Sequence, residues 1–192
     1  YVGTDDGLIH VTENGGENWK KYDRFVSVPE MTYVNMLLGS QHDGNVVFAA
    51  FNNHKRGDFK PYILKSTNKG KSWKSISSNL PDRGSVYAIA EDHINPDLLF
   101  VGTEFGLFFT VDGGKYWKQI KAGLPTIAVR DLAIQEREND LVLGTFGRGF
   151  YVLDDYSSLR NMNKNTFDKE AEIFPVKHGL MFIQNSRIGG KD

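Results

Sequence analysis

The chain has 192 residues, of which 40% are apolar and 12% aromatic, so it can bury a sizeable core and is not disordered. Its net charge of −1 provides no strong field toward nucleic acid or an anionic membrane, and neither partner is expected. It has no cysteine, which excludes disulfides and thiolate chemistry, and no apolar stretch approaches the ~20 residues that span a bilayer.

Short alternating apolar segments, separated by glycine-rich turns, predict an all-β chain of antiparallel meanders. The first unit has three strands, at about 1–4, 7–12 and 18–23. The second unit runs through 32–39, 46–52, 62–67 and 73–77, with an insertion at 52–58. The third covers 85–91, 98–103, 106–111 and 116–121, and the fourth covers 128–134, 141–145 and 149–153. We therefore expect about three and a half four-stranded units.

One short motif recurs at the end of the first three units. A hydroxyl residue is followed by Asp or Asn, then by glycine, then by tryptophan, at offsets of two, two and three positions. The copies are Thr12, Asn14, Gly16 and Trp19; Ser66, Asn68, Gly70 and Trp73; and Thr110, Asp112, Gly114 and Trp117.

Each position of this motif has a structural reason. An Asp or Asn side chain binds backbone N–H groups just ahead of it, and glycine supplies the positive φ of a tight turn. The tryptophan covers the open end of a hairpin. We interpret these residues as structural and not catalytic.

The motif resembles the Asp-box, or BNR repeat, of sialidases, xyloglucanases and sortilin-type receptors. In those families the box lies between the third and fourth strands of a β-propeller blade. The tryptophans here are 54 and 44 residues apart, close to the ~40–50 residue period of propeller blades. The resemblance implies a β-propeller fragment with a three-stranded first blade.

The segment 144–155, together with 158–160 and 174–175, is similar to the end of the propeller in large bacterial BNR proteins with sortilin-like N-terminal regions. The predicted organisation is propeller blades over 1–160, then a last-strand segment and tail over 161–192, with the strand itself at 171–176 and a linker from 189. A short helical turn capped by Asp155 follows the fourth unit. The resemblance implies an exported protein that is periplasmic, on the cell surface or secreted.

An arc of three and a half blades leaves strand edges exposed, and propellers typically have ~4–8 blades. The chain also begins within a predicted strand, at Tyr1. We therefore expect the remaining blades of a longer parent chain, or self-association, to complete the ring.

Turns between the second and third strands share one end of the sheets with the blade-to-blade connections, where propeller clefts usually form. The candidate ligand-binding residues at this end are Arg130, Arg148, Phe105 and Phe146; Asp5, Asp6, Glu104 and Tyr151 are also expected there or nearby. Arg130 and Arg148 suit an anionic ligand, whereas the aromatic residues suit a glycan or a peptide.

The alternative is a glycosidase that uses two carboxylates. Asp5 best matches the catalytic aspartate of xyloglucanases, which this chain resembles in its strand–turn–strand segments, and Glu104 is the equivalent position in the third unit. The three-arginine cluster of sialidases cannot be assigned. The five histidines lack metal-ligand spacing, so neither a metal nor a cofactor is expected.

These observations favour a non-catalytic binding or scaffolding module of a larger exported bacterial protein. The alternative is part of a glycoside hydrolase whose active site needs the missing blades. A pair of carboxylates in an open cleft would favour the hydrolase, and an aromatic face would favour binding.

Overall fold

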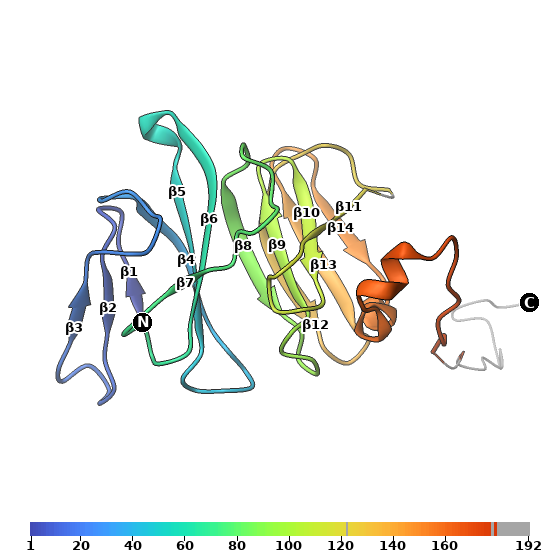
Figure 1. Ribbon diagram of the computed structural model, residues 1–192, viewed down its shortest axis with the longest axis horizontal. Coiled ribbons are helices and arrows are strands. Elements are labelled where there is room, and N and C mark those ends of the chain that lie inside the picture. The colour runs from blue at the N-terminus through green and yellow to red at the C-terminus, as the bar shows by residue number, and fades with distance from the viewer. Residues whose placement is uncertain (122, 178, 180–192) are drawn as a thin grey trace, which may run out of the picture.

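The computed structural model describes residues 1–121, 123–177 and 179, which form four antiparallel sheets (Figure 1). The first sheet contains β1 (Val2–Gly3), β2 (Ile9–Val11) and β3 (Lys20–Tyr22). The second contains β4 (Tyr33–Gly39), β5 (Val47–Asn53), β6 (Asp58–Ser66) and β7 (Lys74–Ser75). The third contains β8 (Val86–Glu91), β9 (Leu99–Thr103), β10 (Gly106–Thr110) and β11 (Lys118–Ile120), and the fourth contains β12 (Val129–Gln135), β13 (Asp140–Thr145) and β14 (Phe150–Leu153).

Strands that follow one another in the chain are neighbours in every sheet, so each sheet is a simple meander. The predicted all-β fold of three and a half units is confirmed, including the three-stranded first unit. The insertion predicted at 52–58 is shorter than expected, because β5 continues to Asn53 and β6 already begins at Asp58. Only the 3-10 helix η1 (His54–Arg56) and Gly57 remain as the turn between these strands.

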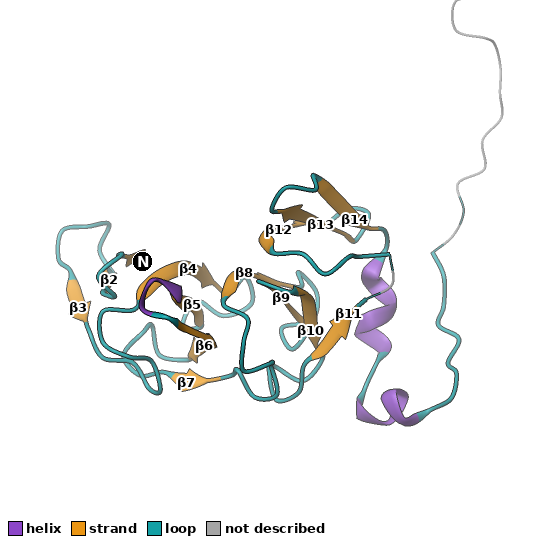
Figure 2. Cartoon of the chain, turned by 90° about the horizontal axis from the view of Figure 1, so that it is seen from above, coloured by secondary structure: helices purple, strands orange, loops and turns teal. Residues whose placement is uncertain are grey.

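The four sheets stand side by side in an arc (Figures 1 and 2), and β4, β8 and β12 lie along one side of it. The core fills the space between neighbouring sheets in three parts. Ile9, Val34 and Phe51 pack between the first two sheets, and Phe48, Ile89 and Trp117 between the second and third. The third part, which includes Phe100, Leu132 and Tyr156, joins the last two sheets and the segment that follows them.

A glycine in the second strand of a sheet lets the next sheet approach closely. A Cβ atom built on Gly102 of β9 would lie 2.6 Å from the Val129 carbonyl oxygen of β12. A Cβ on Gly3 of β1 would likewise lie 2.4 Å from Cγ1 of Val34 in β4. Both distances are far below ordinary contact, so the inner strand of each following sheet can take its place only because these two residues lack side chains.

The chain leaves the fourth sheet through two 3-10 helices, η2 (Tyr156–Asn161) and η3 (Lys164–Asp168). The predicted cap is confirmed, because the Asp155 carboxylate accepts a hydrogen bond from the Ser157 backbone N–H. The strand predicted at 171–176 is wrong: this segment has no regular structure in the described residues, and Ile173 and Val176 are almost fully exposed. An apolar segment forms a β-strand only when another strand pairs with it, and no strand of the described residues pairs with 171–176. The linker predicted from 189 lies outside the described residues.

None of the helices among the described residues is long and apolar enough to cross a membrane.

Candidate functional site

The three boxes are the turns β2–β3, β6–β7 and β10–β11. They are turns between third and fourth strands when β1, β2 and β3 are counted as the last three strands of a four-stranded unit. In the third box, the Thr110 hydroxyl donates to the Asp112 carboxylate (2.7 Å) and accepts from the Gly114 backbone N–H (3.1 Å). The Tyr116 backbone N–H donates to the same carboxylate (3.0 Å). The first two boxes repeat these bonds with Asn14 and Asn68 in place of the aspartate. The polar side chains of the boxes are thus engaged in closing their own turns.

The three box tryptophans have different surroundings. Trp117 is buried between the second and third sheets, and its indole N–H donates to the Ile76 carbonyl of the second sheet (2.7 Å). Trp19, in the first sheet, is exposed and donates to its own Gly16 carbonyl (3.0 Å). Trp73 packs edge-on against Phe25, and its N–H has no partner in the described part of the chain. Only Trp117 therefore covers a hairpin and also bonds the preceding sheet.

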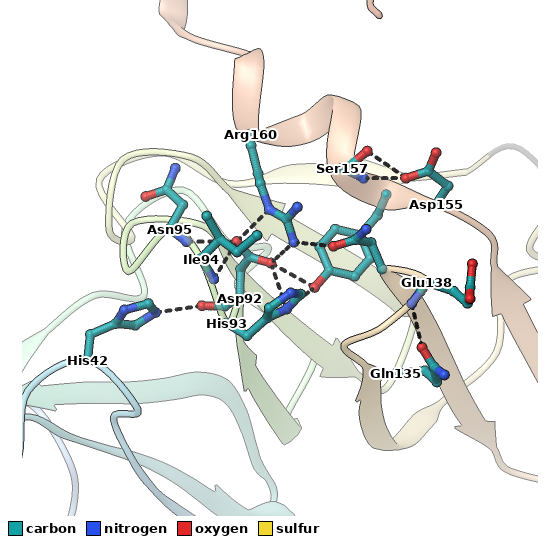
Figure 3. A network of polar contacts seen from close by, with 12 residues as sticks. His42, Asp92, His93, Ile94, Asn95, Gln135, Glu138, Asp155, Ser157 and Arg160 are labelled. Atoms are coloured by element: carbon teal, nitrogen blue, oxygen red, sulfur yellow. Dashed lines mark hydrogen bonds and ion pairs between the residues drawn. The ribbon is translucent and has the colours of Figure 1, made fainter. Parts of the chain in front are cut away.

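A buried polar network lies at the box end of the sheets (Figure 3). Asp92, in the turn between β8 and β9, is fully buried and accepts hydrogen bonds from Arg160 Nε (2.8 Å) and Nη2 (2.7 Å) and from the Tyr156 hydroxyl (2.7 Å). Nη2 of Arg160 also donates to the side chain of Asn139 (2.7 Å). Because these residues belong to the third sheet, the fourth sheet and η2, the network locks the outgoing chain to the last two sheets.

The pKa values of this network follow from burial and hydrogen bonding. Burial alone would raise the pKa of Asp92, but hydrogen bonds from Arg160 and Tyr156 outweigh it and lower the pKa below its usual range. Burial and the bond to Asp92 raise the pKa of Tyr156. The carboxylate is ionised, fully paired and shielded from solvent, so we assign the network to stability and not to ligand binding.

The opposite end of the sheets carries the turns between second and third strands, and the β5–β6 turn projects at the top of Figure 1. Glu104, Phe105, Arg130 and Phe146 come together there, from the third and fourth sheets. Asp5 is exposed in the β1–β2 turn of the first sheet and does not line the cavities described below. Arg148 and Tyr151 do not line the cavity around Arg130 either. The predicted face is therefore only partly assembled into one site.

The centre of this site is a cavity of about 280 Å³, here called the arginine cavity. It is lined by His54, Phe59, Arg83, Gly84, Ser85, Tyr87, Glu104, Phe105 and Arg130. These residues come from the β5–β6 turn and the start of β6, the connection into β8 and the start of that strand, the β9–β10 turn and the start of β12. The second, third and fourth sheets therefore all contribute to one site.

Arg130 is held by aromatic rings. Its guanidinium lies 3.7 Å from the Tyr87 ring centroid and 5.3 Å from that of Phe146, both within the range of cation–π attraction. In the described part of the chain, the only carboxylate within 4 Å of Arg130 is that of Glu104, and the 3.7 Å separation is longer than a hydrogen bond. The guanidinium is thus positioned mainly by cation–π contacts.

Glu104 has a second and closer partner. The Tyr87 hydroxyl donates a hydrogen bond to its carboxylate. Burial and this bond raise the pKa of Tyr87 to about 12, so the phenol stays protonated at neutral pH and remains a donor. Glu104 is consequently tied to the wall of the cavity by Tyr87 while it faces Arg130.

A second cavity of about 390 Å³, here called the proline cavity, adjoins the first. The two share Arg83, Gly84 and Phe105. The proline cavity is lined in addition by Pro81, Thr103, Gly106, Phe108, Gln119, Ile120, Lys121, Leu124, Pro125 and Thr126. Its lining contains several apolar residues, and Arg83 and Lys121 are its charged side chains. The proline cavity therefore suits an apolar group that lies next to a charged group in the same ligand.

Among the described residues, the two cavities do not hold the pair of carboxylates that a glycosidase needs. Glu104 is the only described Asp or Glu that lines either cavity, and it is already paired. Asp5, the best catalytic candidate from the sequence, lies two sheets away from Glu104 along the arc. No group of three or more metal-ligating side chains is found among the described residues.

Sequence reasoning missed six lining residues of the arginine cavity: His54, Phe59, Arg83, Gly84, Ser85 and Tyr87. The last four occupy the connection into β8 and the start of that strand, and connections of this kind were expected at this face. Arg83 could therefore have been predicted from its place in the connection into β8. The contact of Tyr87 with Arg130 joins residues far apart in the sequence and leaves no local pattern.

No protein-family model matches the chain, and no curated protein sequence matches it. Solved structures do share its fold at low identity. One is YCF48 bound to a D1 peptide, with a TM-score of 0.57, 19% identity, and coverage of 81% of this chain and 46% of that chain. Another is the β-propeller domain of Cps50 (Swd1) from Myceliophteria thermophila, with a TM-score of 0.55, 16% identity and coverage of 92% and 53%.

The GH74 xyloglucanase from Xanthomonas campestris is also similar, with a TM-score of 0.55, 19% identity, and coverage of 74% of this chain and 23% of that chain. The chain spans about half or less of the length of these three structures. Its four sheets therefore have the fold of part of a β-propeller, and the likeness concerns the fold alone.

Proposed function

We propose that this part of a β-propeller is a non-catalytic binding module that holds a peptide segment at the face formed by the arginine and proline cavities. The observation that carries the proposal is the composition of this face: aromatic rings and two arginines surround a single carboxylate, which Tyr87 already binds. Such a surface offers stacking and hydrogen-bond donors but no acid–base pair. The likeness to YCF48, which was solved with a D1 peptide, supports a peptide over a glycan.

The proposal is tested by screening the 192-residue protein against a displayed random peptide library and a glycan array. Saturable binding of peptides is expected, and it should weaken in Arg130→Gln. Arg148→Gln is the matched control, because it removes the same charge at the same end of the sheets from a residue that does not line the cavity. Binding that Arg148→Gln weakens as much as Arg130→Gln would place the ligand elsewhere.

The second candidate is a share of a glycoside hydrolase site, completed by blades that this chain does not contain. The likeness to a GH74 xyloglucanase favours it only at the level of the fold. Incubation with xyloglucan and with sialosides decides between the two. The binding module predicts no turnover, whereas turnover that is lost in Glu104→Gln or Asp5→Asn would overturn the proposal.

We also propose that the module belongs to a larger exported bacterial protein of the sortilin-like BNR type, in which further blades complete the ring. The boxes and the similar segment at 144–155 support this context. Sedimentation velocity tests the completion of the ring: we expect the isolated protein to self-associate through its end sheets. A stable monomer over a wide concentration range would count against it.

A further inference from the structure

The charged side chains that line the arginine cavity indicate the chemistry of its ligand, and this inference rests on the proposed function. Its charged lining residues are Arg83 and Arg130 against Glu104, and His54 adds a titratable ring. The Arg83 guanidinium lies 5.8 Å from the Phe59 ring centroid, so aromatic rings flank both arginines. The cavity therefore presents an excess of positive charge on positioned side chains.

Cation–π contacts leave the donors of a guanidinium available. They attract the charge of the whole group to the ring and do not by themselves use its N–H groups as hydrogen-bond donors. Glu104 stands 3.7 Å from Arg130 and is bound by the Tyr87 hydroxyl, so it only partly satisfies that arginine. A planar fork of two parallel N–H groups matches a carboxylate, which it binds through two hydrogen bonds at once.

A second observation points to the same ligand. Ser85 is one of the lining residues and is 1% exposed, and its buried hydroxyl has no hydrogen-bond partner in the described part of the chain. Buried polar groups in native proteins nearly always have a partner, so this hydroxyl indicates a missing one. A rotation of the Ser85 side chain about χ1 would bring the hydroxyl toward a carboxylate in the arginine cavity.

The neighbouring proline cavity adds the second half of the ligand. It shares Phe105 and Arg83 with the arginine cavity, and its lining includes Phe108, Leu124 and Pro125. We infer that the face recognises a peptide carboxylate next to an apolar or aromatic side chain, with Arg130 as the direct ligand of the carboxylate and the proline cavity as the pocket for the side chain. The carboxylate comes from an acidic side chain or from the end of a peptide chain.

Three blocked dipeptides test this inference by calorimetry and separate the two sources. N-acetyl-glutamyl-phenylalanine amide carries a side-chain carboxylate, N-acetyl-glutaminyl-phenylalanine free acid carries a terminal one, and N-acetyl-glutaminyl-phenylalanine amide carries none. Hydrogen bonds to charged groups predict that at least one acid binds about 10- to 100-fold more tightly than the neutral compound. The tighter of the two acids identifies the source.

The variants make the test specific. Arg130→Gln should abolish the preference for the acid, and Arg130→Lys should remove most of it, because lysine keeps the charge but lacks the planar fork. Arg148→Gln is the control and should keep the preference. Unfolding curves of each variant show whether it has folded.

Several outcomes would overturn the inference. Equal binding of acid and neutral dipeptides would do so, as would a preference that survives Arg130→Gln. If no dipeptide binds at millimolar concentration and the Arg130 Nε–H resonance of ¹⁵N-arginine-labelled protein does not shift, the inference also fails. Library peptides that bind without a preference for a carboxylate would contradict this inference alone. If no peptide binds at all, the proposed function is contradicted as well.

Discussion

The close approach of the third and fourth sheets at Gly102 predicts that Gly102→Ala will destabilise the protein. The new Cβ would lie 2.6 Å from the Val129 carbonyl oxygen and 2.8 Å from Val129 Cγ1. A side chain could rotate away, but the carbonyl belongs to β12, so the strand must move by about 0.8 Å to restore ordinary contact. Overpacking of this kind typically costs about 1–3 kcal/mol.

The repeat provides two matched controls within the same chain. Gly144 occupies the equivalent position in the fourth sheet, and the nearest atoms to a Cβ there belong to Asp131, with its Cβ at 3.4 Å and its backbone O and N at 3.8 and 3.9 Å, which are ordinary contacts. Gly144→Ala should therefore be neutral or stabilising by up to about 1 kcal/mol, because alanine loses less backbone entropy on folding. Gly3→Ala should fall between the two, because its main clash is with the Val34 side chain and not with backbone.

Urea denaturation followed by tryptophan fluorescence measures all three variants under the same conditions. The expected order of unfolding free energy is Gly144→Ala highest, Gly3→Ala intermediate and Gly102→Ala lowest. If Gly102→Ala proves as stable as Gly144→Ala, the sheets can separate freely at this point. The explanation of the repeated glycine by close sheet packing would then be wrong.

Two further predictions concern the buried network and the boxes. Asp92→Asn should lower the unfolding free energy by about 3–5 kcal/mol, because it leaves the buried Arg160 without its charge partner. The folded-state pKa of Asp92 is lowered, so the ionised carboxylate stabilises the native protein at pH values above the unfolded pKa of about 4, and this stabilisation is lost as pH falls through the folded pKa. The urea midpoints of the native protein and of Asp92→Asn should therefore converge between pH 7 and pH 3. Trp117→Phe should lower the unfolding free energy by about 1–3 kcal/mol, because the Ile76 carbonyl loses its buried donor. Trp19→Phe should change it by no more than about 0.5 kcal/mol, because Trp19 is exposed. Equal losses in thermal or urea unfolding would contradict this role of burial.

The features that sequence predicted well are those encoded by neighbouring residues. The box bonds join residues two to four positions apart, such as Thr110 to Asp112 and Gly114, so their pattern is visible in the sequence. Strand alternation is equally local, and the expected order of the strands from β1 to β14 in the four sheets is confirmed. The same holds for the cap at Asp155, whose partner is Ser157.

The features that were missed depend on residues distant in the sequence. Arg130 reaches Tyr87, and Arg160 reaches Asp92, across more than forty positions in each case. The segment 171–176 shows the reverse error: its apolar residues fit a strand, but whether a strand forms depends on a neighbour that the local pattern does not specify. Pro175 also removes a backbone donor from any such pairing.

The two ends of the sheets differ in how their charged side chains are paired. At the box end, the Asp112 carboxylate is consumed by its own turn and the Asp92 carboxylate by Arg160, so these groups have little left to offer a ligand. At the opposite end, the only carboxylate that faces Arg130 among the described residues is that of Glu104, at 3.7 Å, which is beyond hydrogen-bond distance. A guanidinium that is only partly paired keeps donors for an acceptor that arrives from outside, as the proposed function requires. Under that proposal the end that holds the fold together and the end that binds a partner are distinct, so substitutions at Arg130 should change binding with little change in stability, and substitutions at Asp92 should do the opposite.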